Sequence, residues 1–280
     1  MIKCVFCGSE NVVKNGNRRC RTRNKQRYFC KSCSKSFIDD IEFSKIKGTP
    51  QIVTLSLDLY FKGISLRQIQ DHLKQIYDFK VHHETVRRWI IRYTGLMNDY
   101  VDKFKVFGSK EWHVDEQMIK SKGKYVWLWN ALDADSRFLI ACSVTERREI
   151  GDARLIFKKA KELTIGDPET ITTDGLWSYE KAIRREMQTL GYRKLMRHIR
   201  LVSMQDKINN NLIERYHSTF RSRDKVMRGS AKGIINGYRL YYNFIRPHMS
   251  LDGQTPAQAA GINLKLQDNK WLSLIKVSMR

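Results

Sequence analysis

Two cysteine pairs near the amino terminus narrow the folds that the first part of this chain can adopt. Cys4 with Cys7, and Cys30 with Cys33, each have the spacing C-x-x-C. So short a segment buries little apolar surface and needs a cross-link or a metal to stay folded. Two such pairs supply four thiolates, which suit one tetrahedral Zn²⁺ and leave it no open coordination position. We therefore predict a zinc ribbon over residues 1–40 with one structural zinc; the alternative is four unrelated buried cysteines.

The segment between the cysteine pairs is basic, and residues 14–29 contain no acidic side chain. A basic loop that a metal holds in place is suited to contacting DNA phosphates. We expect four arginines to make these contacts: Arg18, Arg19, Arg21 and Arg23. Cys20 lies in the same loop, and we expect its thiol to be free.

The chain as a whole is strongly basic. Its 280 residues include 52 Lys and Arg against 29 Asp and Glu, a net charge of +23. Such a charge favours a polyanionic partner, either a nucleic-acid backbone or an anionic membrane surface. No apolar run approaches the ~18 residues that span a membrane, and the first residues contain no stretch typical of a signal peptide. We therefore expect a cytoplasmic, nucleoid-associated protein of two or three domains whose partner is nucleic acid.

Residues 41–106 have the apolar periodicity of helices. Helices are expected over 52–61, over 65–77 with Ser65 as the N-cap, and over 83–95. Two helices joined by a short turn are typical of a helix-turn-helix DNA-binding domain. The third helix would present three arginines to DNA: Arg87, Arg88 and Arg92. The alternative is an ordinary three-helix bundle that links two domains.

Residues 107–262 alternate between strand and helix patterns. Three strands, a helix, a fourth strand and a second helix are expected at 111–119, 125–133, 137–145, 152–163, 169–175 and 178–189. A short strand at 198–203, a helix that carries Glu214 and an aromatic helix at 233–247 follow. This order is typical of an α/β fold, a mixed sheet flanked by helices. We expect residues 263–280 to form a loose extension.

Three carboxylates of this region could meet at one site. Asp115 lies within a strand among apolar neighbours, where an uncompensated charge would be costly. Asp174 ends a strand, which is where ligands gather in α/β sheets, and Glu214 lies on a helix that could cross both strands. Their oxygen atoms suit two Mg²⁺ or Mn²⁺ ions, which about 4 Å apart assist phosphoryl transfer. We interpret four other acids as turn, rim or cap residues: Glu116, Asp133, Asp135 and Asp152.

Basic residues follow Glu214 along its helix, as a DNA backbone leading to the metals would require. They are Arg215, Arg221, Arg223, Lys225 and Arg228. Arg221 lies two helical turns after Glu214 on the same face, which makes it the candidate for holding the scissile strand. The alternative for Glu214 is a surface salt bridge within a basic helix.

Four segments of the chain resemble the catalytic core of insertion-sequence DDE transposases, most closely insertion-sequence family six. The segments are HVDEQMIKSKGKYVWLWNALDADSR, TITTDGLWSYEKAI, NNLIERYHSTFRSRDKVMRG and YYNFIRPHMSLDGQTPAQAAGI, and the similarity covers about residues 50–262. The resemblance implies an integrase-like, ribonuclease H-like core that follows an N-terminal DNA-binding region. It also implies Asp115, Asp174 and Glu214 as the catalytic acids and Trp177 as a DNA contact.

The resemblance further implies an activity. Such an enzyme binds the terminal inverted repeats of its element and cuts a strand at each end with the help of bound metal ions. The freed 3′-hydroxyl then attacks the target DNA at the same site. The expected partners are double-stranded transposon ends and target DNA, and pairing two ends implies a homodimer or a larger homo-oligomer.

Two other functions remain open at this stage. Tyr241 and Tyr242, near Arg246 and His248, could serve a tyrosine-type recombinase. Aromatic residues at helical spacing more often pack a helix against its neighbours. The second alternative is a non-catalytic zinc-ribbon protein that regulates by binding DNA.

Overall fold

The computed structural model describes residues 2–4, 6–19, 24–38, 48–121, 123–187, 196–201, 210–227 and 232–279. Four residues named above lie outside these ranges: Cys20, Arg21, Arg23 and Arg228. The ends of the predicted elements at 178–189 and 198–203 also lie outside them. Among the described residues, no helix is both long and apolar enough to cross a membrane.

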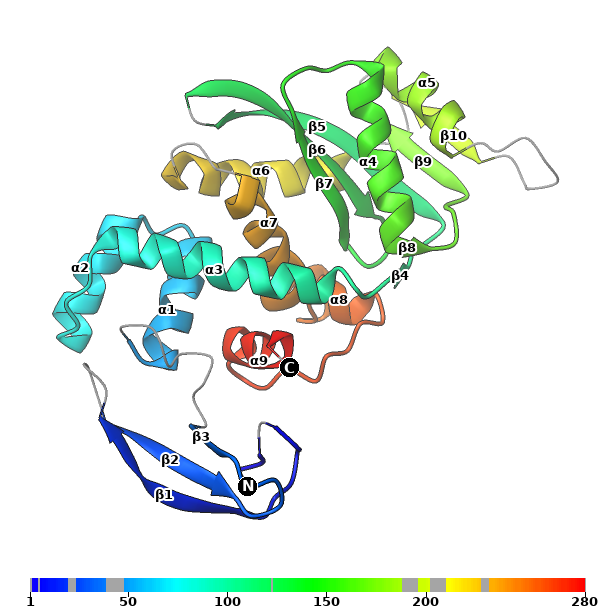
Figure 1. Cartoon of the computed structure of the whole chain (residues 1–280). Helices are drawn as coiled ribbons and strands as arrows, with labels where there is room; N and C mark the ends of the chain where they lie inside the picture. Colours follow the sequence, from blue (N-terminus) through cyan, green and yellow to red (C-terminus); the bar gives the residue numbers. More distant parts are fainter. Residues whose placement is uncertain are drawn as a thin grey trace.

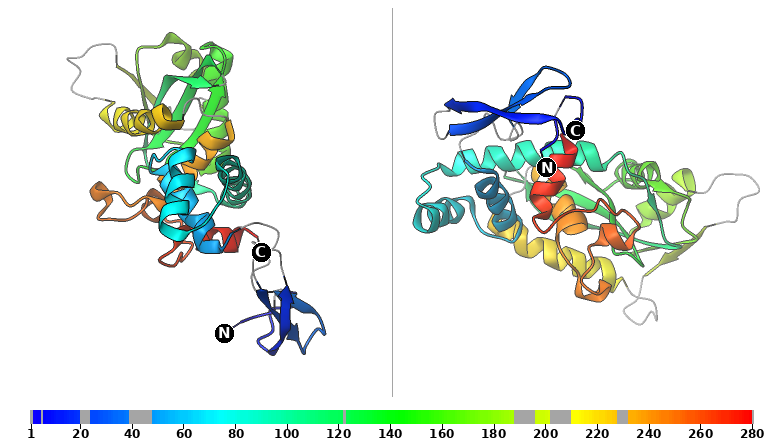
Figure 2. Two further views of the ribbon diagram at one scale, coloured as in Figure 1. Left: turned by 90° about the vertical axis from the view of Figure 1, so that its left-hand side faces the viewer. Right: turned by 90° about the horizontal axis from the view of Figure 1, so that it is seen from below.

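The amino-terminal segment forms a small antiparallel sheet. Its strands are β1 (Val12–Arg19), β2 (Asn24–Cys30) and β3 (Ser36–Ile38), which pair in that order. Cys4, Cys30 and Phe37 form its core, which is separate from the main core of the chain. Figure 2 shows these strands lying outside the layers formed by the rest of the chain. This segment therefore has few apolar residues to stabilise it, as expected of a metal-dependent module.

Three helices follow the ribbon: α1 (Pro50–Phe61), α2 (Leu66–Tyr77) and α3 (His83–Val101). The predicted N-cap Ser65 is confirmed, because its hydroxyl accepts the N–H of Gln68 while the Gln68 side chain accepts the N–H of Ser65. The predicted end of the third helix at residue 95 is wrong, since α3 continues to Val101. Its last turns bury Met97 and Val101, and α3 packs on a later helix, α7 (Lys232–Leu240). That tertiary contact extends the helix past Gly95.

Within the described part of the chain, the main sheet has five strands in the order β10-β9-β5-β6-β7. They are β5 (Glu111–Ser121), β6 (Lys124–Asp133), β7 (Leu139–Thr145), β9 (Thr170–Thr173) and β10 (Arg197–Arg200). Strands β5, β6 and β7 are antiparallel, whereas β9 and β10 run parallel to β5. A separate short pair joins β4 (Val106–Phe107) to β8 (Thr164–Ile165). This mixed order of strands confirms the expected ribonuclease H-like fold.

Helices cover both faces of the sheet. Helix α4 (Ile150–Leu163) packs on β6 and β7, and α5 (Trp177–Glu186) packs beside α4. Helix α6 (Asn211–Met227) contacts β5 and β6 from the other face (Figures 1 and 2). Because both faces are covered, the strands are buried over most of their length.

The last residues do not form the loose extension predicted for 263–280. After α7 come a π-helical turn (Tyr241–Ile245), a 3₁₀ turn (Met249–Leu251), α8 (Pro256–Ala259) and α9 (Lys270–Ser278). Helix α9 buries Trp271 in the main core, where the indole stacks on Phe61 and Tyr241 and its N–H donates to Asp58 Oδ1 at 3.2 Å. The amino-terminal helices and the carboxyl-terminal helix therefore share one core (Figure 1).

Candidate active site

The acidic residues lie where two parallel strands stop pairing with each other. The pairing of β5 with β9 stops at Val114 and Thr173. Asp115 is the next residue of β5, which continues to Ser121, and Asp174 directly follows β9, so the two residues lie side by side where this pairing ends. Ligands of α/β sheets gather at the carboxyl ends of parallel strands, and Asp174 occupies such a position after β9.

Three carboxylates meet at this edge. One oxygen each of Asp115, Glu116 and Asp174 can be chosen so that all three lie within 4.8 Å of one another. Asp115 and Asp174 are two of the three predicted acids, whereas Glu116 is not. Three clustered oxygen donors match the preference of Mg²⁺ and Mn²⁺, so the residues present fit a hard divalent cation.

Glu116 was interpreted from the sequence as a turn, rim or cap residue, and that interpretation is wrong. Its side chain is 1% exposed, accepts a hydrogen bond from the Tyr179 hydroxyl and forms an ion pair with Arg148. Burial raises the pKa of Glu116 to about 7; Asp174 and Asp115 add to the rise, and the Tyr179 and Arg148 contacts oppose it. The sequence signal was present, because a residue next to an inward-facing acid on a strand covered on both faces is itself buried.

Asp174 is partly buried beside the other two acids. Burial raises its pKa, the charge of Asp115 adds to the rise, and the N–H of Leu176, 3.0 Å from Oδ1, opposes it. Arg148 Nη2 lies 3.6 Å from Asp174 Oδ2, which also favours the charged form. The acids thus repel one another, and a bound cation would relieve that repulsion.

His217 of α6 contacts Asp115 and fixes its position. Its Nδ1 lies 3.4 Å from Asp115 Oδ2, and its Nε2 lies 3.0 Å from Asn130 Nδ2. Asn130 pairs with Asp115 across β5 and β6, so the three side chains share one face of the sheet. An amide nitrogen only donates, so this assignment makes Nε2 the acceptor and leaves the Nδ1 proton facing Asp115. No local sequence pattern indicates this role of His217, because it depends on a contact between distant elements.

Glu214 is not part of the compact carboxylate cluster. It is exposed on the first turns of α6, and it lines a cavity of about 660 Å³ together with Asp115, His217, Arg221 and Lys225. Of the predicted acids, the structure therefore brings Asp115 and Asp174 into one cluster and places Glu214 on the wall of the adjoining cavity. The catalytic role of Glu214 stays a prediction.

The predicted basic residues fall into different positions. Arg221 lines the cavity and donates to Gln117 Oε1 at 3.3 Å, and Arg215 is exposed. The Arg223 side chain instead lies against Gly63, between α1 and α2. Trp177 is 54% exposed at the start of α5, with Lys181 Nζ 4.9 Å from its ring centroid.

The amino-terminal and helical arginines also differ from one another. Arg18 and Arg19 are exposed on β1. Arg88 and Arg92 are exposed on α3, whereas Arg87 pairs with Glu84 at 2.6 Å. An internal ion pair reduces the charge that Arg87 can offer to a phosphate, so Arg88 and Arg92 are the freer cations of the three.

The four cysteines of the ribbon come together. Sγ of Cys4 lies 3.5 Å from that of Cys33, Sγ of Cys7 lies 3.6 Å from that of Cys30, and all four lie within 4.8 Å of one another. A tetrahedron with about 2.3 Å zinc–sulfur bonds has edges of roughly 3.8 Å. The thiol cluster is therefore compatible with one zinc ion.

The tyrosines considered as recombinase nucleophiles are buried. Tyr241 and Tyr242 are each 5% exposed, and burial raises the pKa of Tyr242 to about 12. Tyr216 and Phe220 of α6 belong to the same aromatic cluster. These tyrosines pack the helix, and their hydroxyls are not presented to a DNA strand.

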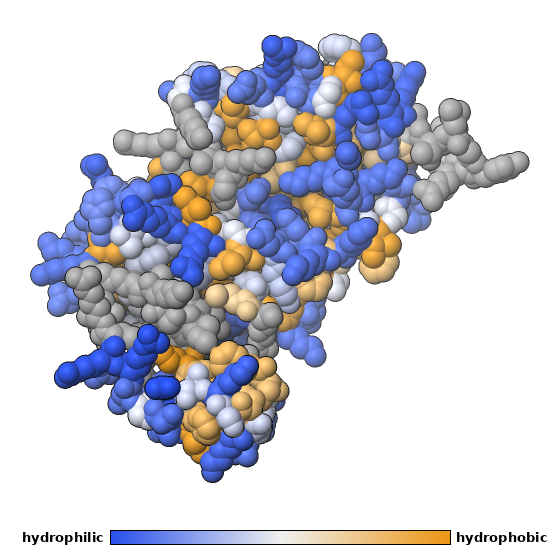
Figure 3. Space-filling model, in the orientation of Figure 1, coloured by the Kyte–Doolittle hydropathy of each residue, from blue (hydrophilic) through white to orange (hydrophobic). Residues whose placement is uncertain are grey.

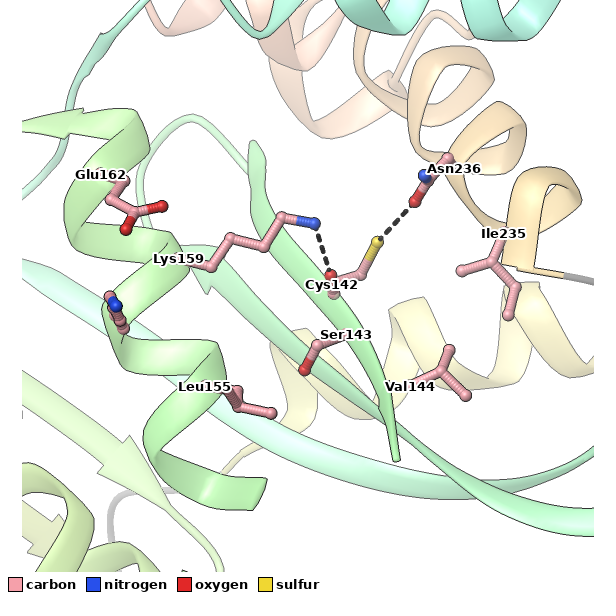
Figure 4. Close-up of a pocket in the computed structure, with 9 residues that line it drawn as sticks. Cys142, Ser143, Val144, Leu155, Lys159, Glu162, Ile235 and Asn236 are labelled. Carbon is pink, nitrogen blue, oxygen red and sulfur yellow. Dashed lines mark hydrogen bonds between the residues drawn. The ribbon is translucent and has the colours of Figure 1, made fainter. Parts of the chain in front are cut away.

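A second cavity, of about 400 Å³, lies at the β7 edge between α4 and α7. Figure 4 shows Lys159 donating to the Cys142 carbonyl at 2.9 Å and Cys142 facing Asn236. Glu162 is the carboxylate among its described lining residues, so this cavity lacks the clustered acids of the other edge. Elsewhere, hydrophilic side chains cover most of the face in Figure 3, with apolar ones scattered among them.

The chain thus combines a ribonuclease H-like sheet with a cluster of carboxylates at the point where two of its parallel strands stop pairing. Residues 109–246 match the family model of the IS240-type transposase DDE domain, and this span contains Asp115, Asp174 and Glu214. Over this span and beyond it, the chain is similar to the DDE transposases of insertion sequences.

Curated proteins are similar to this chain over most of its length. A transposase for the insertion sequence-like element IS431mec of Staphylococcus aureus is 27% identical over 220 residues, which are 76% of this chain and 94% of the relative. A protein of Methanocaldococcus jannaschii, MJ0017, is 22% identical over 213 residues, 73% of this chain and 91% of the relative. Among solved structures, the HTLV-2 integrase catalytic core domain in complex with magnesium aligns with a TM-score of 0.40 and 15% identity, over 55% of this chain and 97% of that one.

Proposed function

We propose that this transposase cuts and joins DNA strands at the edge formed by Asp115 and Asp174, with Glu214 as the third acid. The observation that carries the proposal is the cluster of Asp115, Glu116 and Asp174, which adjoins a cavity that Arg221 and Lys225 help to line. Clustered carboxylates next to cations are what a metal-dependent reaction on a phosphodiester needs. The proposed substrates are the double-stranded ends of the element and its target DNA.

The side chains at this site would have different roles. Asp115, Asp174 and Glu214 would hold Mg²⁺ or Mn²⁺, as one or two ions. When bound, such ions activate an attacking oxygen and stabilise the leaving one. His217 orients Asp115, while Arg221 and Lys225 line the cavity through which the scissile strand would pass. Their charges would bind its phosphates.

The other parts of the chain would bind the DNA at positions distant from the reacting bond. Arg18 and Arg19 of the zinc ribbon, Arg88 and Arg92 of α3, and Trp177 of α5 are exposed and suited to phosphate or base contacts. The two ends of one element must be held together, so the working form would be a homodimer or a larger homo-oligomer. We place this assembly on the nucleoid in the cytoplasm.

The direct test is strand cleavage and strand transfer on DNA carrying the ends of the element, with Mg²⁺. Asp174→Asn and Glu214→Gln should still bind the ends but cut them at least about a thousandfold more slowly, because several kcal/mol of transition-state stabilisation is lost. Asp135→Asn is the matched control, since Asp135 is an exposed turn residue, and it should cut normally. Normal cutting by Asp174→Asn would overturn the proposed site. If wild type binds ends and never cuts, a non-catalytic DNA-binding regulator is the better description.

A further inference from the structure

We propose that Arg148 is a built-in counter-ion that competes with the divalent cation for Asp174 and thereby sets the metal affinity of the site. This inference rests on the proposed function, because it takes Asp174 as a metal-holding residue. It goes further by giving a role to a residue outside the three acids. Arg148 is a positioning residue here, since it acts on the metal through Asp174.

Arg148 approaches two acids from the segment between β7 and α4. Its guanidinium forms an ion pair with Glu116, and its Nη2 lies 3.6 Å from Asp174 Oδ2. The guanidinium carbon lies 4.6 Å from the centroid of the Trp127 ring, which supports its flat face. A single cation therefore lies against two members of the carboxylate cluster.

The chain on both sides of Arg148 is held in place. Thr145 Oγ1 donates to the carbonyl of Arg147 at 2.7 Å and accepts from the Trp129 indole N–H at 2.7 Å. On the other side, the Glu149 N–H donates to Asp152 Oδ2 at 3.0 Å and starts α4. The backbone on both sides of Arg148 is thus fixed by hydrogen bonds. This restricts where its side chain can lie, unlike that of an arginine on a mobile surface loop.

The two ion pairs of Arg148 are unequal. Glu116 is 1% exposed, and the Tyr179 hydroxyl fixes its other oxygen, so the pair with Glu116 is deep and anchored. Asp174 is 38% exposed, and its separation from Arg148 is longer. Arg148 Nε has no hydrogen-bond partner among the described residues, so no further bond ties the guanidinium to Asp174. The contact with Asp174 is therefore the one that can yield.

This arrangement suits exchange between two kinds of cation. Without metal, three neighbouring acids need positive charge, and Arg148 supplies it. Arg200 contributes from further away while its Nε donates to the Gly175 carbonyl at 2.9 Å. When a divalent cation takes Asp174, Arg148 keeps Glu116 and gives up Asp174. The guanidinium thus stabilises the metal-free site and weakens metal binding.

The test measures Mn²⁺ binding to the full chain without DNA, from the electron paramagnetic resonance signal of free Mn²⁺. Arg148→Gln keeps a donor for Glu116 but removes the charge, and we expect it to bind Mn²⁺ about tenfold more tightly than wild type. Arg147→Gln is the matched control: its side chain is 77% exposed and pairs with Glu149, and its Mn²⁺ affinity should not change. Equal or weaker binding by Arg148→Gln overturns the inference.

A thermal readout separates competition from a merely structural role. Metal-free Arg148→Gln should melt below wild type, and saturating Mn²⁺ should raise its melting temperature by more than that of wild type. A structural role alone would lower the melting temperature without a larger gain from Mn²⁺, and that result contradicts the inference. If Arg148→Gln does not fold, Trp127→Leu is the second variant: it removes the ring beneath the guanidinium and should also tighten Mn²⁺ binding. Unchanged or weaker Mn²⁺ binding by Trp127→Leu would overturn the inference.

Failure of the proposed function would look different. Asp174→Asn should lose the Mn²⁺ bound by wild type. If Mn²⁺ binding is insensitive to Asp174→Asn, the metal site itself is misplaced, whatever Arg148 does. If Asp174→Asn abolishes binding while Arg148→Gln does not tighten it, the site stands and only the role of Arg148 is lost.

Discussion

At the scale of single residues, other side chains hold the clustered carboxylates in position. Asp115 is oriented by His217, which is itself held by Asn130, and Glu116 is held by Tyr179 and Arg148. Partners that orient a metal-holding carboxylate contribute to affinity and activity without touching the metal. His217 is 4% exposed, so its ring has little freedom to leave this position.

We predict that His217→Phe slows strand cleavage about 10- to 100-fold and raises the Mg²⁺ concentration needed for half-maximal rate. The reason is that Asp115 loses the ring N–H that orients it. Single-turnover cleavage at several Mg²⁺ concentrations measures both effects. Asp135→Asn, at an exposed turn outside the cavity, is the control and should behave as wild type. A variant with unchanged metal dependence would show that His217 only fills space.

His248 predicts a pH dependence of stability. Burial, and then the charge of Arg246, lower the pKa of His248 to about 4 from its usual value near 6.5. The unfolded chain therefore binds a proton that the folded chain rejects, so the free energy of unfolding decreases as the pH falls from about 6.5 to about 4. Because the ring is partly exposed and solvent screens its charge, we expect the free energy of unfolding to fall by about 1–2 kcal/mol.

Urea unfolding at pH 7.5 and pH 5 measures this loss. His248→Gln cannot titrate, so the stability it loses between the two pH values should be smaller than that of wild type. Equal losses would mean that His248 is not the responsible group.

At the scale of secondary-structure elements, the helices before and after the catalytic sheet form one packed unit. Helix α3 packs on α7 and α9, and α1 packs on α3 and α9. Gly237 of α7 allows this approach, because a Cβ there would lie 2.6 Å from Phe61 Cζ and 2.8 Å from Thr94 Cγ2. At Gly95 of α3, by contrast, substitution by Ala would meet no neighbouring atom of the described residues within 4 Å of the new Cβ.

This contrast gives a matched pair of substitutions. Gly237→Ala should destabilise the protein by about 1–3 kcal/mol, because overpacking of Phe61 and Thr94 outweighs the gain in helix propensity. Gly95→Ala should leave stability unchanged or increase it by up to about 1 kcal/mol. Chemical denaturation of both variants checks the prediction. If both variants change the free energy of unfolding by the same sign and amount, the close packing of α7 does not restrict the side chain at position 237.

At the scale of the whole molecule, the strong positive charge is distributed over modules with different stabilising forces. The main core is a large apolar cluster, whereas the ribbon has a core of a few residues around its thiols. A metal that binds only the folded ribbon supplies folding free energy to that module. Loss of the metal should therefore unfold the ribbon and leave the main core intact.

We predict that Cys4→Ser loses bound zinc and weakens binding to element ends, while the melting temperature of the main core stays close to that of wild type. Zinc content, end binding and a melting curve test the three parts together. Ser9→Ala, near the same turn but with no thiolate to lose, is the control. Near-normal end binding by Cys4→Ser would argue against the ribbon as a DNA-binding module.

Local patterns predicted much of this protein. Strand alternation, the Ser65 cap and the paired C-x-x-C spacing each depend on residues close together in the chain, and the structure has the corresponding elements. The continuation of α3 and the docking of α9 were missed, because their apolar faces are satisfied by helices more than a hundred residues away.

The sequence alone determined a basic protein and predicted an N-terminal thiol cluster, a mixed sheet, one acid within a strand and one at a strand end. Which acids meet depended on long-range geometry. The parallel pairing of β5 and β9 ends at Val114 and Thr173, and this brings Asp174 to Asp115 and Glu116, while α6 carries Glu214 to the cavity beside them. Contacts among Glu116, Arg148 and Tyr179 join three separate elements, and no local pattern encodes such a meeting, because it follows from how the whole core packs.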